Sequence, residues 1–147
     1  MSYLKGGIWI GILFWIDLLT KYLFCDCWIG KDLWLFEPVV NHWISWWISA
    51  SLYFVIPVSI LWIVAFFWLW KKKYLSDIVL IFLLAWTLWN LFDRIFLWGV
   101  RDFISIWKFP VFNMADVYLT IGVIRLIIED LWVLQYLKKW LKNNKIF

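Results

Sequence analysis

Two aspartates, Asp102 and Asp116, stand in a polar segment, residues 90–116, that lies between two long apolar runs. If this segment folds back on itself, the two carboxylates can meet. Carboxylates held close together cannot both ionise, so the pair shares one proton and titrates as a unit. The ionised member can take a proton from water while the other polarises a carbonyl, and the roles reverse as an amine leaves. The spacing therefore indicates peptide hydrolysis by an aspartyl pair at a membrane boundary.

The same segment also holds Asn90, Asp93, Arg94 and Asn113. Ionisable groups at the edge of hydrocarbon are costly, so a functional site is their default interpretation. Asn90 precedes Arg94 by four residues, and Asn113 precedes Asp116 by three. On a helix, either spacing places both side chains on one face, so each helix end can aim its polar groups at one spot.

Each of these residues also has a purely structural interpretation. Asn113 and Asp116 follow a proline and match a helix N-cap with an acid in the first turn. Asp93 and Arg94 could simply end a span at the interface, and Asp102 could be an ordinary loop acid. Taken singly, the structural interpretations are at least as well supported as the functional ones.

An earlier pair, Asp17 and Lys21, lies near the end of the first apolar run, four residues apart. This spacing places both on one helix face, where an ion pair anchoring the helix at the membrane interface is the expected role. From these two residues alone, that structural role is favoured over a functional one.

The composition indicates an integral membrane protein. The 147 residues are 66% hydrophobic and 24% aromatic, only 16% are charged, and the mean hydropathy is +0.84. Soluble domains are about half apolar and about a quarter charged. The length predicts a single domain, residues 1–147. The net charge of +4 forms no basic face of the kind that nucleic-acid binding needs, so no nucleic-acid partner is expected.

The counts of histidine and cysteine exclude other chemistries. His42 is the only histidine, which argues against a histidine-based catalytic triad. Cys25 and Cys27 are too close in sequence for an ordinary disulfide, and no Cys/His set supports a metal site.

Four apolar runs are long enough to predict transmembrane helices: residues 6–24, 50–70, 77–91 and 112–136. Residues 26–49 are too polar to span and are rich in tryptophan, so we expect short strands and a loop on the outer membrane surface. The predicted fold is an all-α membrane protein with four transmembrane helices and a small strand and loop platform on the extracytoplasmic face.

The distribution of basic residues predicts the orientation. Four spans put both termini on one side of the membrane, and the other side carries five basic residues. The side with the termini carries eight: Lys5, Lys71, Lys72, Lys73, Lys138, Lys139, Lys142 and Lys145. The positive-inside rule then places both termini in the cytoplasm. The acidic segments around Asp17, Asp102 and Asp116 would lie at the opposite face.

Five motifs occur in an order that resembles one family. They are DLLTK at residues 17–21, an Asn-led loop at Asn41, NLFDR at 90–94, V-x-D-F at 100–103 and FNMAD at 112–116. In this order and over nearly the whole length, the chain is similar to lipoprotein signal peptidase, signal peptidase II. FNxAD with an upstream NxxDR is specific, whereas DxxTK alone would be weak.

The resemblance implies Asp102 and Asp116 as the catalytic pair. It implies substrate-binding or supporting roles for Asn41, Asn90, Arg94, Asn113, Asp17, Lys21 and Asp93. Family members cleave a prolipoprotein just before its diacylglyceryl-modified cysteine, at the outer side of the bacterial cytoplasmic membrane. They use no metal, and no other cofactor is expected. The expected partners are such prolipoproteins and membrane lipid, and the expected state is a monomer.

Two rival interpretations come from other classes. A catalytically degenerate relative or a non-enzymatic four-helix scaffold would keep the spans and basic ends without needing both Asp102 and Asp116. A transporter is disfavoured because the polar residues cluster at one face and do not line a path through the bilayer.

Three departures from the family pattern are visible. Arg101 replaces a usual apolar residue beside Asp102, and the segment from Asp102 to Asp116 is a few residues short. Four tryptophans stand where the family has glycine: Trp43, Trp86, Trp89 and Trp98. Glycine lets transmembrane helices approach and lets loops take positive φ. We hypothesise that some are UGA codons, read here as tryptophan, from a lineage that reads UGA as glycine. The alternative is genuine tryptophans, some in an interfacial belt.

Overall fold

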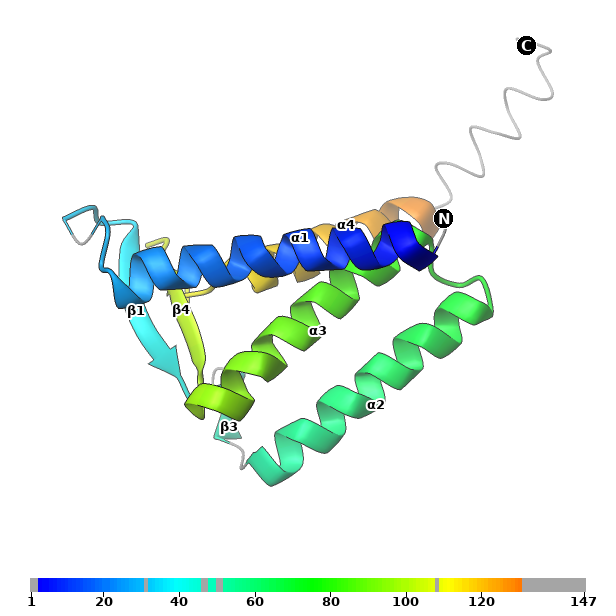
Figure 1. Cartoon of the computed structure of the whole chain (residues 1–147), viewed down its shortest axis with the longest axis horizontal. Coiled ribbons are helices and arrows are strands. Elements are labelled where there is room, and N and C mark those ends of the chain that lie inside the picture. Colours follow the sequence, from blue (N-terminus) through cyan, green and yellow to red (C-terminus); the bar gives the residue numbers. More distant parts are fainter. Residues whose placement is uncertain (1–2, 31, 46–47, 50–51, 108, 131–147) are drawn as a thin grey trace, which may run out of the picture.

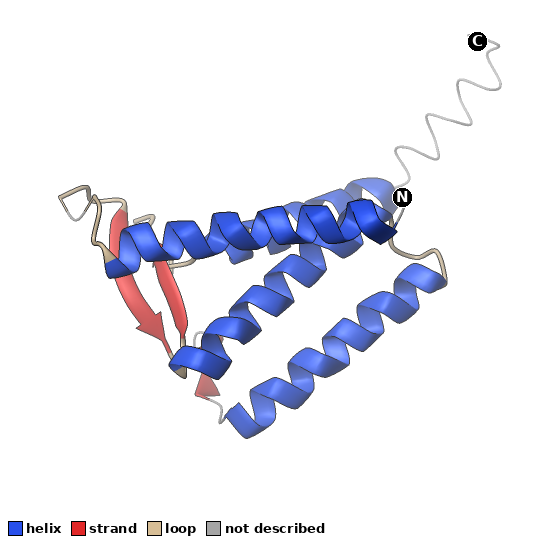
Figure 2. Cartoon of the chain, in the orientation of Figure 1, coloured by secondary structure: helices blue, strands red, loops and turns tan. Residues whose placement is uncertain are grey.

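The computed structural model describes residues 3–30, 32–45, 48–49, 52–107 and 109–130, which form four α-helices and four short strands (Figures 1 and 2). The helices are α1 (Tyr3–Lys21), α2 (Leu52–Lys71), α3 (Asp77–Leu97) and α4 (Met114–Asp130). A π-helical segment, η1 (Tyr22–Asp26), continues α1. The strands are β1 (Phe36–Asn41), β2 (Trp43–Ser45), β3 (Ile48–Ser49) and β4 (Val100–Ile104).

Three of the helical segments are long and apolar enough to cross a membrane. They are Leu4–Asp26, Tyr53–Lys71 and Asp77–Leu97, so three of the four predicted spans are confirmed as candidates. The third extends to Leu97, beyond the predicted end at residue 91. Helix α4 has 17 described residues. The rest of the predicted fourth span, residues 131–136, and the lysines of residues 138–145 lie outside the described residues.

Helix α3 lies at the centre of the bundle and contacts each of the other three helices. It buries Val79, Leu80, Leu83 and Leu84 against Phe66 of α2. On its other side, Ala85 packs with Ala115 and Tyr118 of α4. Small side chains at such a contact let two helix backbones approach closely.

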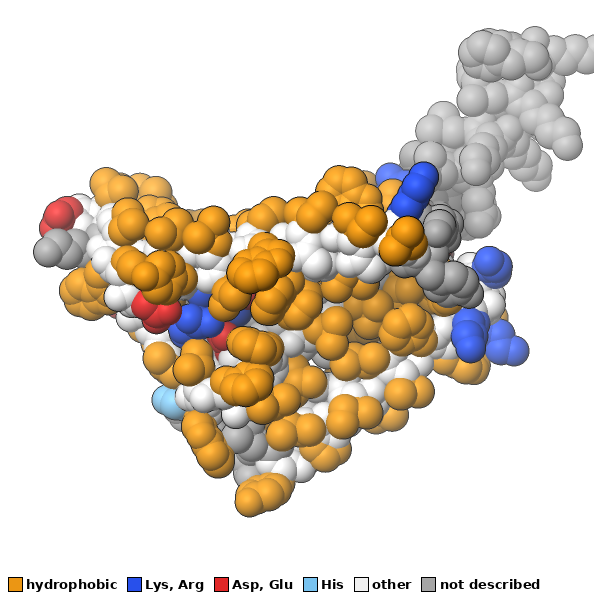
Figure 3. Space-filling view, viewed as in Figure 1, with side chains coloured by type: hydrophobic (Ala, Val, Ile, Leu, Met, Phe, Trp, Pro, Cys, Tyr) orange, Lys and Arg blue, Asp and Glu red, His pale blue; other side chains and the backbone are white. Residues whose placement is uncertain are grey.

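The outward sides of the helices are apolar. Trp9 and Trp15 of α1 and Leu61 and Trp68 of α2 are all exposed. Figure 3 shows apolar side chains along the length of the molecule, with lysines gathered at the end that holds the N-terminus and the α2–α3 turn. A surface that exposes this much apolar area suits hydrocarbon and is unfavourable in water.

The small sheets cover the opposite end of the bundle, where α1 and α3 finish (Figure 1). Strand β1 pairs antiparallel with β4, and the register places Val39 opposite Asp102 and Asn41 opposite Val100. The register shifts between Phe36 and Val39. Strands β2 and β3 form a second antiparallel pair.

The predicted strands between residues 26 and 49 are confirmed. No strand was expected at Val100–Ile104, however. Asp102 lies in this strand, so the alternative interpretation of Asp102 as an ordinary loop acid is wrong.

A tight turn joins α3 to β4. Trp98 follows the helix with a φ of 61°. A Cβ atom on Gly99 would lie 2.7 Å from Val40 Cγ1 and 2.9 Å from His42 Nδ1, so a larger residue there would force one or both of these side chains to shift. Trp28 and Trp107 also have positive φ, at 54° and 49°. A bulky residue rarely adopts this backbone region, because its Cβ meets the neighbouring carbonyl oxygen.

Candidate active site

The chain folds back between β4 and α4, as the sequence predicts. Ile104 N donates to Phe112 O at 2.9 Å, and Phe112 N donates to Ile104 O at 3.0 Å. Phe103 N also donates to Phe112 O, at 3.1 Å. This return places the start of α4 directly beside β4, so Asp102 and Asp116 belong to adjacent segments.

Asn113 links the two aspartates. Its buried side-chain amide donates to Asp102 Oδ1 at 2.7 Å, while its main-chain N donates to Asp116 Oδ2 at 3.2 Å. Asp116 N donates in return to Asn113 Oδ1 at 3.2 Å. These reciprocal bonds form a capping box at the start of α4. The structural interpretation of Asn113 and Asp116 is therefore also correct, and the cap holds the Asp116 side chain in place.

Asp116 receives two more hydrogen bonds, both from α3. Asn90 Nδ2 donates to its Oδ1 at 3.3 Å, and Trp86 Nε1 donates to the same oxygen at 3.1 Å. With Asn113 N, the carboxylate has three N–H donors, an arrangement that stabilises its negative charge. Asn90 Oδ1 in turn accepts from Asn113 Nδ2 at 3.1 Å, so the amides of α3 and α4 are fixed to each other.

Asp102 is the more enclosed carboxyl group, with 3% of its surface exposed. Asn41 Nδ2 at the end of β1 donates to its Oδ2 at 2.9 Å. Burial raises the pKa of Asp102 to about 6, and the nearby charge of Asp116 acts in the same direction. The hydrogen bonds from Asn41 and Asn113 and the charge of Lys21 oppose this rise in the pKa. This carboxyl group therefore binds a proton at a pH closer to neutral than an ordinary aspartate does.

A buried ion cluster lies next to the aspartates. Lys21 Nζ is 2.7 Å from Asp17 Oδ2 and 3.1 Å from Asp93 Oδ2, and all three side chains are almost fully buried. Asp17 Oδ1 accepts from Ala115 N, one residue before Asp116, at 3.0 Å. The predicted i,i+4 ion pair of Asp17 and Lys21 is therefore confirmed. It lies inside the protein and not on an exposed helix face, and it ties α1 to α3 and to the start of α4.

The guanidinium of Arg94 bonds to the main chain of its own helix. Its NH1 donates to the main-chain oxygen of Asn90 at 3.3 Å. Its half-buried charge lies within electrostatic reach of Asp102, Asp116 and Asp93. The structure thus gathers all nine predicted site residues at one end of the bundle. Eight of them form side-chain hydrogen bonds or ion pairs with one another or with the main chain of α4, while Arg94 bonds to its own helix and contributes charge.

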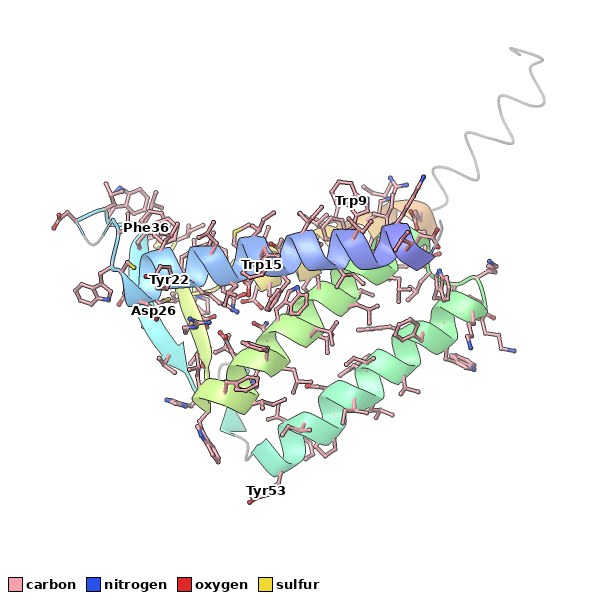
Figure 4. All side chains as sticks on the ribbon, in the orientation of Figure 1. Trp9, Trp15, Tyr22, Asp26, Phe36 and Tyr53 are labelled. Atoms are coloured by element: carbon pink, nitrogen blue, oxygen red, sulfur yellow. The ribbon has the colours of Figure 1, made fainter. Side chains whose placement is uncertain are left out.

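Three residues of this region were not predicted. Trp86 donates to Asp116 as described, and Arg101 forms ion pairs with both Asp93 and Asp26. Asp26 lies where η1 meets the sheet (Figure 4). Arg101, which stands beside Asp102 where the family usually has an apolar residue, was a visible signal for one of these contacts. Trp86 and Asp26 carried no such signal, because their partners are 30 and 75 residues away.

Comparison with known proteins agrees with the resemblance found in the sequence. A family model described as signal peptidase (SPase) II matches residues 9–132. The lipoprotein signal peptidase of Bartonella tribocorum is 34% identical over 100 residues, which cover 62% of this chain and 56% of that protein. That of Bartonella bacilliformis is 32% identical over 100 residues, covering 62% and 61%. The chain thus spans less than two thirds of the length of these relatives.

Two solved structures, both described as bacterial membrane enzymes, share the fold. One has a TM-score of 0.73 at 23% identity and covers 88% of each chain. The other has a TM-score of 0.73 at 24% identity and covers 90% of this chain and 96% of that one.

Proposed function

Because this chain belongs to the signal peptidase II family, we propose that it is a membrane aspartic endopeptidase acting on prolipoproteins. It would remove the signal peptide by cleaving before a diacylglyceryl-modified cysteine. The observation that carries this proposal is the pair of carboxyl groups, Asp102 and Asp116, connected through Asn113. The relatives named lipoprotein signal peptidase support the choice of substrate class.

The environments of the two carboxyl groups support a division of roles. Asp102, with its raised pKa, holds the shared proton and donates it to the scissile carbonyl oxygen. Asp116, which has three N–H donors, is the carboxylate that takes a proton from the attacking water. When the tetrahedral intermediate collapses, Asp116 passes its proton to the leaving amine and Asp102 regains one from the intermediate.

The proposed setting is the bacterial cytoplasmic membrane. All of residues 1–147 would form one domain with four spans, the fourth being the one that the sequence predicts at residues 112–136. Both termini would be cytoplasmic, with the sheets and the aspartyl pair at the extracytoplasmic face. The enzyme would act as a monomer. Lys5 and the lysines of the α2–α3 turn support this orientation, because cytoplasmic segments carry an excess of basic residues.

Replacing either aspartate tests the proposal. Asp102→Asn or Asp116→Asn should each lower cleavage of a lipid-modified precursor by at least about a hundredfold, because general acid–base catalysis contributes on that scale. Asp32→Asn is the matched control, since Asp32 is exposed in the loop before β1. Near-normal turnover in either site variant, with normal insertion, would remove that residue from the mechanism.

The same assay tests the substrate class. Each buried CH₂ of an acyl chain contributes about 0.8 kcal/mol to membrane association, so a precursor carrying diacylglyceryl should be strongly preferred. Equal rates on modified and unmodified precursors would contradict this. No cleavage of either by the purified wild-type protein would favour the rival interpretation, a degenerate relative or a non-enzymatic scaffold.

A further inference from the structure

Arg101 precedes Asp102 on β4 but faces away from it. Successive side chains of a strand point to opposite sides, and the contacts agree with this rule. Asp102 contacts Asn41 and Asn113, whereas Arg101 contacts Asp93 and Asp26. The two sides of β4 are therefore held by different sets of partners.

The contacts of Arg101 join three separate segments. Its NH2 donates to Asp93 Oδ1 at 2.9 Å, and its Nε and main-chain N donate to Asp93 Oδ2 at 3.4 and 3.1 Å. Its NH1 donates to Asp26 Oδ2 at 2.9 Å. The planar guanidinium thus binds a carboxylate of α3 through two nitrogens and a carboxylate of η1 through a third, which a lysine ammonium cannot do in one geometry.

The charge of Arg101 is also needed locally. Asp93 and Asp17 are both buried, and Lys21 lies between them as a single cation. Without Arg101, the Lys21 ammonium would be the one described cation within ion-pair distance of both buried carboxylates, with the Arg94 charge further away. A buried charge without a full partner is strongly unfavourable, so α3 and β4 would have to shift to admit water.

We infer that Arg101 is a positioning residue for the proposed reaction, acting through the β4 backbone to hold Asp102 at its place beside Asn113. Asp93 and Asp26 fix one side of the strand, so that the carboxyl group on the other side meets Asn41 and Asn113. A displacement of about 1 Å in a reacting group can lower a rate about a hundredfold. This inference rests on the proposed function for its effect on catalysis, but not for its effect on β4.

Three variants test the inference. Arg101→Met keeps the apolar stem and removes the fork, Arg101→Lys keeps the charge, and Asp26→Asn removes only the outer partner. Arg125→Met is the matched control, because Arg125 is an exposed arginine of α4 whose ion pair in the described part of the chain is with Glu129, four residues further on. Each would be purified with wild type, and kcat and KM would be measured on a lipid-modified precursor.

The expected order of kcat is wild type, then Arg101→Lys and Asp26→Asn, then Arg101→Met. Arg101→Met should lower kcat by about tenfold to a hundredfold and change KM by no more than about twofold, since the carboxyl geometry changes and substrate binding does not. Arg125→Met should match wild type. Unchanged kcat in Arg101→Met, or a fall matched by the control, would overturn the inference.

Amide hydrogen exchange provides a second measurement that needs no turnover. The N–H groups of Phe103 and Ile104 bond to Phe112 O, so their exchange reports the place of β4 beside α4. Arg101→Met should speed exchange in β4 at least about tenfold while the α3 core stays protected. If wild type cleaves nothing, the proposed function fails, and this exchange alone decides the role of Arg101. Unchanged exchange in β4 would then refute it.

Discussion

At the scale of single residues, burial sets the pKa of Asp102. Its pKa is raised to about 6 from an ordinary value of 3.8, chiefly by burial. The folded protein therefore binds this proton more tightly than the unfolded chain does. The stabilising effect is fully present below the unfolded pKa and is lost as the pH rises through about 6. Above that pH the enclosed carboxylate is a cost to folding, which the hydrogen bonds from Asn41 and Asn113 reduce.

This linkage predicts how Asp102→Asn changes stability. The amide cannot ionise, so the variant escapes the cost of burying a charge at high pH. Between pH 4 and pH 8, the stability difference should move by about 2 kcal/mol in favour of the variant. Unfolding followed in detergent micelles at several pH values would measure the shift. Parallel stability curves for the two proteins would contradict the raised pKa of Asp102.

The four tryptophans on expected glycine positions differ in their surroundings. Trp98 has a positive φ, which favours glycine. Trp89 packs against Phe14 in a tilted arrangement with ring centroids 4.2 Å apart, yet its indole Nε1 is buried and has no hydrogen-bond partner among the residues described. Trp86, in contrast, donates to Asp116. The side chain of Trp43 lies outside the described part. Trp28 and Trp107 join Trp98 as positions where the backbone favours glycine.

The hypothesis of UGA read as glycine therefore applies most strongly to Trp98. Trp98→Gly should stabilise the protein by about 1 kcal/mol, because it relieves the left-handed conformation of a bulky residue. Trp15→Gly is the control and should destabilise it by about 1 kcal/mol, since Trp15 is exposed inside α1. A UGG codon at position 98 in the gene would end the hypothesis there. A UGA codon, with a native mass lower by the tryptophan-to-glycine difference, would establish it.

Helix α1 is tied to the rest of the protein by charge as well as by apolar packing. Asp17 reaches Ala115 N of α4, and Lys21 reaches Asp93 of α3. Both contacts are buried at the end of the helix that meets the sheet. A helix that is otherwise apolar on all sides would have no preferred rotation about its axis, and these two side chains specify one.

Removal of the Lys21 charge should therefore lower the free energy of unfolding. Lys21→Met leaves Asp17 as a buried carboxylate without a cation, and we expect a loss of about 3–5 kcal/mol in unfolding free energy. Lys5→Met, on the exposed far end of the same helix, should change stability by less than about 0.5 kcal/mol. Denaturant titration of the membrane protein would measure both. The added substitution Asp17→Asn should recover part of the loss, and its failure to do so would show that the ion pair is not the cause.

The sequence predicted some elements well and missed others for physical reasons. Long apolar runs predict helices by themselves, so α1, α2 and α3 were found with small errors at their ends. Strand β4 was missed because five residues with two charges show no strand pattern, and the pairing partner in β1 is about 60 residues away. That Asp102 and Asp116 could meet was predicted because the segment between them can fold back, and their catalytic role stays a prediction. The burial of Lys21 and the contacts of Arg101 could not be predicted, because they depend on tertiary packing.

At the scale of the whole molecule, charge and shape predict the orientation in the membrane. Lys5 and the lysines of the α2–α3 turn lie at one end, and the sheets lie at the other (Figures 1 and 3). Cys27 is exposed beside the sheets. In intact cells of a Cys25→Ser variant, a membrane-impermeant thiol reagent should label Cys27. It should label an added Lys72→Cys only after the membrane is permeabilised. The reverse pattern would overturn the proposed topology.

The left-handed backbone at Trp98 also has a consequence for recombinant work. If codon 98 is UGA, a laboratory host that treats UGA as stop would release the chain at Leu97 or earlier. That fragment could retain most of α1 to α3, but it would lack β4 and α4 and therefore both Asp102 and Asp116. It could still reach the membrane fraction, and its inactivity would reflect the host's release factors and not the chemistry of the enzyme. A synthetic gene with a glycine codon at position 98 would avoid this truncation.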